Sequence, residues 1–300
     1  MSDGGLTRRD VLLTAGTVGA VGAAAAGTAG VIRLVGEGGG QPADALLAPR
    51  RDEVPVDDPT DGAWNDAPEL VVPLLAQRVA PPYLDQAGVG DLRVRALHGG
   101  DHVVAFRLEW EDDTVDDLDG VRRYHDAAAV MLPTRSGADP PAITMGAKGV
   151  PVHILQWRAS WQRDLSGLVG VHQIYPRVVH DIMPEDVLPP ETAKLYWVGR
   201  AAGNPLSLRT RTTAVEQVIA EGFGTTTHLP DVDARGTGVH DGSRWTVTLA
   251  VADARRGAGE PLRPGVPWHV AFAVWLGHQE NRGGRKHYAN WVPFRLVEEA

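Results

Sequence analysis

The chain has 300 residues, a formal net charge of −9 at pH 7 and no cysteine. The lack of cysteine excludes disulfide bonds, thiolate metal sites and thiol catalysis. The acidic balance makes nucleic acid an unfavourable partner, because phosphate binding needs a basic surface. A composition with 35 Gly, 22 Pro and 9 Trp is typical of many short strands joined by turns.

The first 36 residues are predicted to be an export signal or an N-terminal membrane anchor. Arg8 and Arg9 precede an uncharged stretch, 11–32, that is rich in Ala, Gly and Thr. Paired arginines before a weakly apolar stretch are typical of twin-arginine (Tat) signals, with an ordinary Sec signal as the alternative. Tat substrates cross the membrane folded, so the protein is expected in the periplasm or on the outer face of the cytoplasmic membrane. Residues 37–54 are predicted to be a linker.

Residues 55–300 are predicted to form one mostly β domain, a β-sandwich with minor helix content. Apolar and polar residues alternate over 92–96, 104–110, 150–157, 245–251, 268–274 and 291–297. These period-two stretches lie between Gly, Asp and Pro clusters, a pattern that favours a sandwich. One short helix is predicted near 213–221, where three β-branched residues share a helical face and Gly222 follows as a C-cap.

Familiar catalytic motifs are absent from the sequence. It contains no G-x-S-x-G, no Walker loop, no dinucleotide fingerprint and no H-E-x-x-H. The 11 histidines are not spaced as metal ligands. Acidic pairs within 112–117 indicate a solvated loop rather than a calcium site. The sequence therefore does not predict a hydrolase.

Two segments contain residue types that are rare in this chain. Met145 is one of 4 methionines and precedes Gly146 at the edge of a predicted strand. Lys286 is one of three lysines, the others being Lys148 and Lys194, and it lies between two Trp-bearing strands. The ordinary interpretations are a core-filling methionine and a solvated loop lysine.

Several short motifs follow one another between about residues 55 and 298. They are Trp64, Ala67-Pro68, Met145-Gly146, Val152 to Trp157 with Trp161, Ala220 to Thr225, Gly242 to Val247, Phe272 to Gly277, Gly284 to Lys286, and Trp291. In this order they resemble the haem b-binding γ subunits of type II DMSO-reductase-family molybdenum enzymes, typified by ethylbenzene dehydrogenase. Relatives of that family serve dimethylsulfide dehydrogenase, chlorate and selenate reductases and archaeal nitrate reductases.

The resemblance implies a β-sandwich that binds one haem b, with Met145 and Lys286 as the axial ligands of the iron. Six-coordinate iron has no open position, so the implied role is electron transfer rather than catalysis. A lysine must lose its proton to bind iron, which requires a desolvated site or the iron itself. His287 is the alternative to Lys286; adjacent strand residues face opposite ways, so only one of the two should point at the iron. Met131 is the alternative to Met145.

The resemblance also implies partners. They are the molybdenum catalytic subunit and the iron–sulfur subunit of the same complex, and an external cytochrome or quinol-linked donor or acceptor. The substrate of the complex is not determined by the sequence, and nitrate is suggested only by analogy. Two other interpretations stay open. One is an exported carbohydrate- or ligand-binding β-sandwich module with an exposed aromatic platform, and the other is a haem-free structural subunit.

Overall fold

The structure is a computed structural model, and it describes residues 33–34, 45–100, 102–167, 169–178, 189, 191–192, 197–208, 211–229 and 234–298. The strands are β1 (Arg33–Leu34), β2 (Leu46–Arg51), β3 (Leu70–Pro73), β4 (Leu75–Ala76), β5 (Asp91–Gly99), β6 (Val103–Glu111), β7 (Ala127–Pro133), β8 (Val152–Arg158), β9 (Val215–Ala220), β10 (Thr227–His228), β11 (Gly238–His240), β12 (Arg244–Ala252), β13 (Trp268–Trp275), β14 (His287–Tyr288) and β15 (Val292–Val297). The helices are α2 (Ala159–Asp164), α3 (Val171–Ile174) and α5 (Val198–Ala201), with 3-10 turns η1 (Gly62–Asp66), η3 (Pro205–Ser207) and η4 (Gly277–Gln279). The mostly β fold predicted from the alternating pattern is confirmed.

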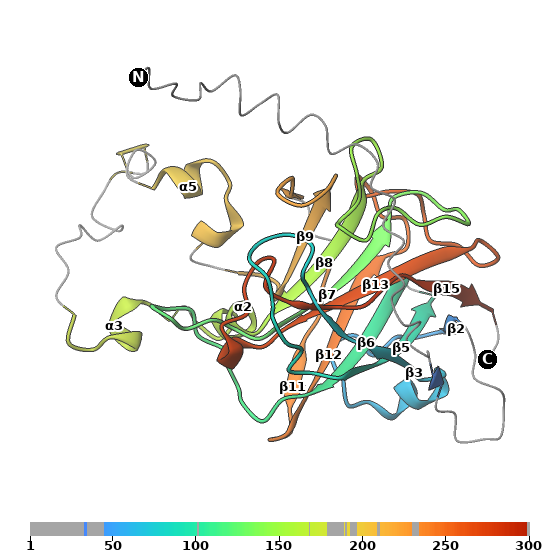
Figure 1. The fold of residues 1–300 in the computed structure, drawn as a ribbon, viewed down its shortest axis with the longest axis horizontal. Helices are drawn as coiled ribbons and strands as arrows, with labels where there is room; N and C mark the ends of the chain where they lie inside the picture. The colour runs from blue at the N-terminus through green and yellow to red at the C-terminus, as the bar shows by residue number, and fades with distance from the viewer. Residues whose placement is uncertain are drawn as a thin grey trace, which may run out of the picture. The chain divides into compact units, whose positions relative to one another are not determined.

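The strands form two layers that are joined through β15. One layer, called here the pocket layer, contains β10, β9, β8, β7 and β13 in spatial order. The other, the back layer, contains β2, β5, β6, β12 and β11, with β3 beside β5. Figure 1 shows β9, β8, β7 and β13 side by side in the pocket layer. The pairs β15–β2 and β2–β5 are parallel, and the other neighbours in this order are antiparallel wherever a strand register is defined.

The core lies between the two layers and is anchored by tryptophans. Trp157 of β8 contacts Trp245 of β12 at 5.1 Å and Trp110 of β6 at 6.5 Å between ring centroids. These three rings are at most 4% exposed. Because each belongs to the inward face of an alternating strand, the period-two pattern of the sequence accounts for this contact between the layers.

The helix predicted near 213–221 is wrong, because Val215–Ala220 is strand β9. It pairs with β8 over its whole length, with Val215 opposite Trp157. Its apolar residues are spaced as on a helix, but they are β-branched, and both faces of this strand are largely buried. Gly222 has a φ of 116° and belongs to the turn between β9 and β10, not to a helix cap.

The segment predicted as a linker, 37–54, contains a central strand. β2 lies between β15 and β5 and is parallel to both. Its Leu46 and Ala48 are fully buried, so this part of the segment belongs to the sandwich. The predicted export signal lies outside the described residues, apart from 33–34. Within the part of the chain that the structure describes, no helix has the length and apolar character needed to span a membrane.

Asp126, directly before β7, connects three parts of the fold. Its Oδ1 accepts from Gly277 N at 2.8 Å, and its Oδ2 accepts from Asp116 N at 2.8 Å and Trp245 Nε1 at 3.1 Å. Asparagine has only one oxygen acceptor, so in Asp126→Asn the N–H donors on one side would face an NH2 group. The free energy of unfolding is expected to fall by about 1–3 kcal/mol. Chemical denaturation measures this, with the exposed Asp113→Asn as the control. Equal stability of the two variants would contradict this prediction.

Candidate functional site

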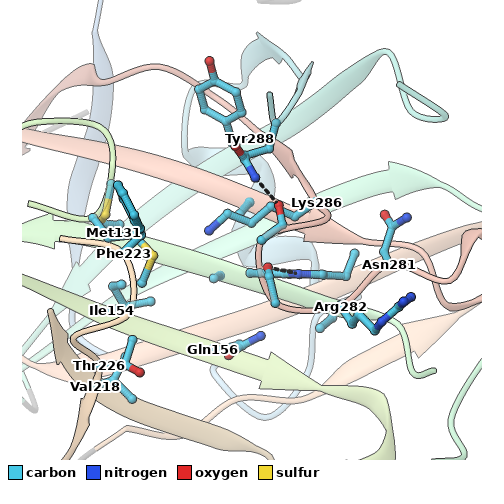
Figure 2. Close-up of a pocket in the computed structure, with 18 of the residues that line it drawn as sticks. Met131, Ile154, Gln156, Val218, Phe223, Thr226, Asn281, Arg282, Lys286 and Tyr288 are labelled. Atoms are coloured by element: carbon cyan, nitrogen blue, oxygen red, sulfur yellow. Dashed lines mark hydrogen bonds between the residues drawn. The ribbon is translucent and has the colours of Figure 1, made fainter. Parts of the chain in front are cut away.

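The outer face of the pocket layer is the floor of a cavity of about 740 Å³. Cofactor and ligand sites commonly measure roughly 300–1,000 Å³. The floor is formed by alternate residues of four strands, and loops around 77–81, 143–145, 204–206 and 223–226 form walls. The floor residues are Ala127, Ala129, Met131, Ile154, Gln156, Arg158, Glu216, Val218, Ala271, Ala273 and Trp275. Figure 2 shows this pocket.

Small side chains keep the centre of the floor open. Ala129 of β7 lies opposite Ala273 of β13. Ala271, two residues before Ala273, is on the same face and lies opposite Met131. These alanines are at most 7% exposed, while the next residue on β7, Val130, faces the core between the layers. A wide apolar floor without bulky side chains at its centre suits a large planar group such as a haem.

Met145 is presented to the cavity by a loop with a fixed backbone. Its φ is 69°, a left-handed value that is uncommon for a residue other than glycine. Its carbonyl accepts a hydrogen bond from Gly222 N at 2.8 Å. Gly146 follows with a φ of 81°, and a Cβ there would lie 2.7 Å from Val150 O. The turn therefore requires glycine at 146, and it holds Met145 in a strained backbone conformation.

Lys286 extends into the same cavity, as Figure 2 shows. Its Nζ lies 5.1 Å from the centroid of the Trp275 ring. Burial lowers the pKa of Lys286 from 10.5 to about 8. Among the described residues, no carboxylate forms an ion pair with this amine and no acceptor binds it. The amine can therefore lose its proton more easily than an exposed lysine and act as a neutral donor.

His287 faces away from the cavity. It is fully buried, and its Nε2 accepts a hydrogen bond from Gly88 N at 2.8 Å. Its Nδ1 lies 3.3 Å from Val274 O, to which it donates. Both ring nitrogens are thus occupied within the protein. Lys286 and His287 point to opposite sides, as expected for neighbours at a strand.

Met145 and Lys286 enter the cavity from opposite ends of β7. The loop of Met145 binds just beyond Ala220 of β9, which is level with Pro133, the last residue of β7. Lys286 precedes β14, which pairs with β13 level with the start of β7. A strand of this length spans about 20 Å. The two side chains therefore face the cavity from its two ends.

Met131 supplies a second thioether to the cavity. It lies on the floor, 9% exposed, whereas Met145 lies on the wall. The two differ in how they are held: Met131 is part of a paired strand, and Met145 belongs to the constrained turn. The structure thus brings Met145, Lys286 and Met131 to one cavity and leaves His287 out of it.

A polar cluster lies at the end of the cavity where β8 ends. Arg158 donates to Gln156 Oε1 at 3.0 Å and to the Glu216 carboxylate, and its Cζ lies 4.6 Å from the Trp161 ring centroid. His228 Nδ1 lies 3.4 Å from Glu216 Oε1. The positive and negative groups of this cluster are therefore paired with each other.

Sequence reasoning missed the alanine floor and the polar cluster. A signal for the floor is present, because β7 begins with three consecutive alanines, Ala127 to Ala129, and Ala271 and Ala273 alternate with Phe272 on β13. The signal becomes informative only when the pairing of β7 with β13 is known. Arg158 and Glu216 carry no sequence signal, since they lie 58 residues apart and meet through the β8–β9 pairing.

The chain matches the family described as Ethylbenzene dehydrogenase over residues 61–287. It is 26% identical over 257 residues to a protein of Haloferax mediterranei named as a respiratory nitrate reductase heme subunit, covering 84% of this chain and 71% of the relative. It is 24% identical over 235 residues to the chlorate reductase subunit gamma of Ideonella dechloratans, covering 76% and 74%. The family match confirms the resemblance that the ordered motifs indicate.

Solved structures with a similar trace include a family 9 carbohydrate-binding module of Caldicellulosiruptor kristjanssonii. Its glucose complex matches with a TM-score of 0.38 and 8% identity over 85% of this chain and 97% of that chain. Its cellotriose complex matches with a TM-score of 0.39 and 9% identity over 85% and 94%.

Proposed function

The chain belongs to the ethylbenzene dehydrogenase family, and we propose that it is an electron-transfer subunit that binds one haem b through Met145 and Lys286. One observation carries this proposal. A lysine without an ion-pair partner among the described residues and a methionine on a constrained turn face one apolar cavity from opposite ends. The names of the two relatives, a heme subunit and a subunit gamma, support it.

The residues of the cavity fit a haem. The thioether of Met145 and the neutral amine of Lys286 are both ligands that iron accepts, and neither is a cysteine. When bound, the haem supplies reversible one-electron chemistry. The chain holds the two ligands in place, and Trp275 and the alanine floor line the cavity beside Lys286. With both axial positions taken, no coordination site is free for a substrate, so the proposed role is not catalytic.

We also propose the partners and the location that the family implies. The partners are a molybdenum catalytic subunit, an iron–sulfur subunit and an external cytochrome or quinol-linked carrier. The subunit gamma of a chlorate reductase among the relatives supports a place in a multi-subunit reductase. The paired arginines Arg8 and Arg9 support Tat export to the outer side of the cytoplasmic membrane.

The alternative of a carbohydrate-binding module loses the feature that suggested it. Of the nine tryptophans, Trp197 and Trp291 are half-buried and the others are buried. The buried ones are Trp64, Trp110, Trp157, Trp161, Trp245, Trp268 and Trp275. None of them is available as an exposed platform for sugar rings.

The proposed function is tested by the absorption spectrum of the purified full chain. The oxidised and dithionite-reduced protein should show a low-spin b-type spectrum, and a pyridine haemochrome assay should give one haem b per chain. A protein that stays free of haem after reconstitution would exclude the electron-transfer role. The haem-free structural subunit would then be the better interpretation.

Met145→Ala is expected to convert the haem from low-spin to high-spin, because the iron loses one axial ligand. Met131→Ala is the matched control, since it removes a thioether from the same cavity and should keep the low-spin spectrum. Absorption and electron paramagnetic resonance spectra of both reconstituted variants measure the change. A low-spin spectrum in Met145→Ala together with a high-spin one in Met131→Ala would reverse the ligand assignment.

A further inference from the structure

Haem carries two propionate carboxylates in addition to its iron, and these need partners at an apolar cavity. A carboxylate leaving bulk water is stabilised by a cation or by charge-assisted hydrogen bonds. Besides Lys286, two guanidinium groups line the cavity, those of Arg158 and Arg282. Two imidazoles also line it, those of His125 and His228.

Three of these cationic or protonatable groups already have carboxylate partners. Arg158 donates to Glu216. His125 Nδ1 lies 2.6 Å from Asp119 Oδ1, and His228 Nδ1 lies 3.4 Å from Glu216 Oε1. A propionate approaching this end of the cavity would meet carboxylates of its own charge. The polar cluster is therefore a poor anchor for it.

Arg282 differs from this cluster in position, and the one carboxylate that pairs with it among the described residues, that of Glu280, is 4.0 Å away. It lies on the hairpin that leads to Lys286, where it forms a β-bridge with Arg285. Its Nη1 donates to Glu280 O at 2.8 Å, and its Cζ lies 4.6 Å from the Tyr124 ring centroid. Figure 2 shows Arg282 on the same side of the pocket as Lys286.

The guanidinium of Arg282 has hydrogen-bond donors without an acceptor among the described residues, and it lies at a solvent-exposed edge of the cavity. The Glu280 carboxylate is 4.0 Å away, and no other carboxylate among the described residues forms an ion pair with it. The Nε and Nη2 groups make no hydrogen bond within the described chain. The side chain is 47% exposed, so it lies where the carboxylates of a bound haem can stay in contact with water.

We propose that Arg282 binds a propionate of the haem at the mouth of the cavity. One hairpin would then supply both the amine of Lys286, which binds the iron, and the guanidinium of Arg282, which binds the propionate. It would thereby set the orientation of the haem in the cavity. A guanidinium suits this task because it can donate two parallel hydrogen bonds to one carboxylate. This inference rests on the proposed haem function.

The test compares haem with haem dimethyl ester, in which both propionates are uncharged. Each is titrated into the haem-free full chain, and binding is followed by the Soret band and by quenching of tryptophan fluorescence. The wild-type protein is expected to bind haem about tenfold more tightly than the ester. Arg282→Gln should lose most of this preference by weakening the binding of haem, with the affinity for the ester unchanged.

Arg122→Gln is the matched control. Arg122 also interacts with the hairpin, through Glu280 at 3.3 Å, but it is 82% exposed and does not line the cavity. It should keep the wild-type preference, and Arg282→Lys should keep part of it. An Arg282→Gln variant that weakens both ligands equally, or neither, overturns the inference. Equal wild-type affinity for both ligands also overturns it while haem binding stands. A wild-type protein that binds neither removes the proposed function and this inference together.

Discussion

Replacing Lys286 with leucine is expected to abolish the low-spin spectrum and also to make the haem-free protein more stable. The iron loses its nitrogen ligand, which leucine cannot replace. In the haem-free state the same change removes a partly buried amine that has no ion-pair partner among the described residues. The free energy of unfolding at pH 7 should rise by up to about 3 kcal/mol.

The sign of this effect follows from the pKa of Lys286. Burial lowers that pKa from 10.5 to about 8, so the folded chain disfavours the charged amine. Below pH 8 the amine is charged in both states, and the folded wild-type protein carries the full free-energy cost of holding that charge in the cavity. As the pH rises from 8 to 10.5 the penalty disappears. The stability advantage of Lys286→Leu should thus be largest at pH 7 and lost above pH 10.5.

Urea denaturation of the haem-free proteins at pH 7 and near pH 10.5 measures this dependence. Lys148→Leu is the control, because Lys148 is exposed and lies on the loop that follows Met145. It should leave both the spectrum and the stability unchanged. If Lys286→Leu lowered stability at pH 7, the amine would have a favourable partner in the folded protein, and the view of Lys286 as a desolvated, unpartnered donor would be wrong.

Enlarging the alanine floor is expected to prevent haem binding without unfolding the protein. Ala129→Leu places three additional carbons in the cavity, where a haem would otherwise lie. Haem affinity should fall about 10- to 100-fold, while the free energy of unfolding of the haem-free protein stays within about 1 kcal/mol. Haem titration and chemical denaturation of the same preparation separate the two effects.

The neighbouring residue gives the matched control. Ala128 is also an alanine of β7, but it is fully buried in the core between the layers. Ala128→Leu should overpack that core and lower the free energy of unfolding by about 1–3 kcal/mol. Unchanged haem affinity in Ala129→Leu would show that the haem does not rest on this floor.

The strands whose sequences alternate with period two could be predicted, including β8 and β13, although these two are largely buried on both faces. β5, β6 and β12 alternate visibly because their second face is partly solvated. β7 is buried on both faces, so its sequence is a continuous apolar run without a period. β9 was misread for a related reason, since its buried faces leave a pattern that a helix also produces.

The site was predictable only where rare residue types mark it. Met145 and Lys286 stand out because methionine and lysine are scarce in this chain, and the ordered motifs place them in a known family. The choice between Lys286 and His287 depends on which way each side chain points, and this becomes visible in the contacts of His287 with Gly88 and Val274. Arg282 could not be separated from the other arginines without its position at the cavity.

The pairing of β2 with β15 has a consequence for synthesis of the chain. β2 follows almost directly on the predicted signal, yet its parallel neighbour β15 is synthesised long after it. Until then the nascent chain lacks the strand that connects the back layer to the pocket layer. A chain that ends before β15 therefore lacks the strand that joins the two layers, and the sandwich stays open. A translocation route that accepts only folded cargo would in this way discard truncated copies.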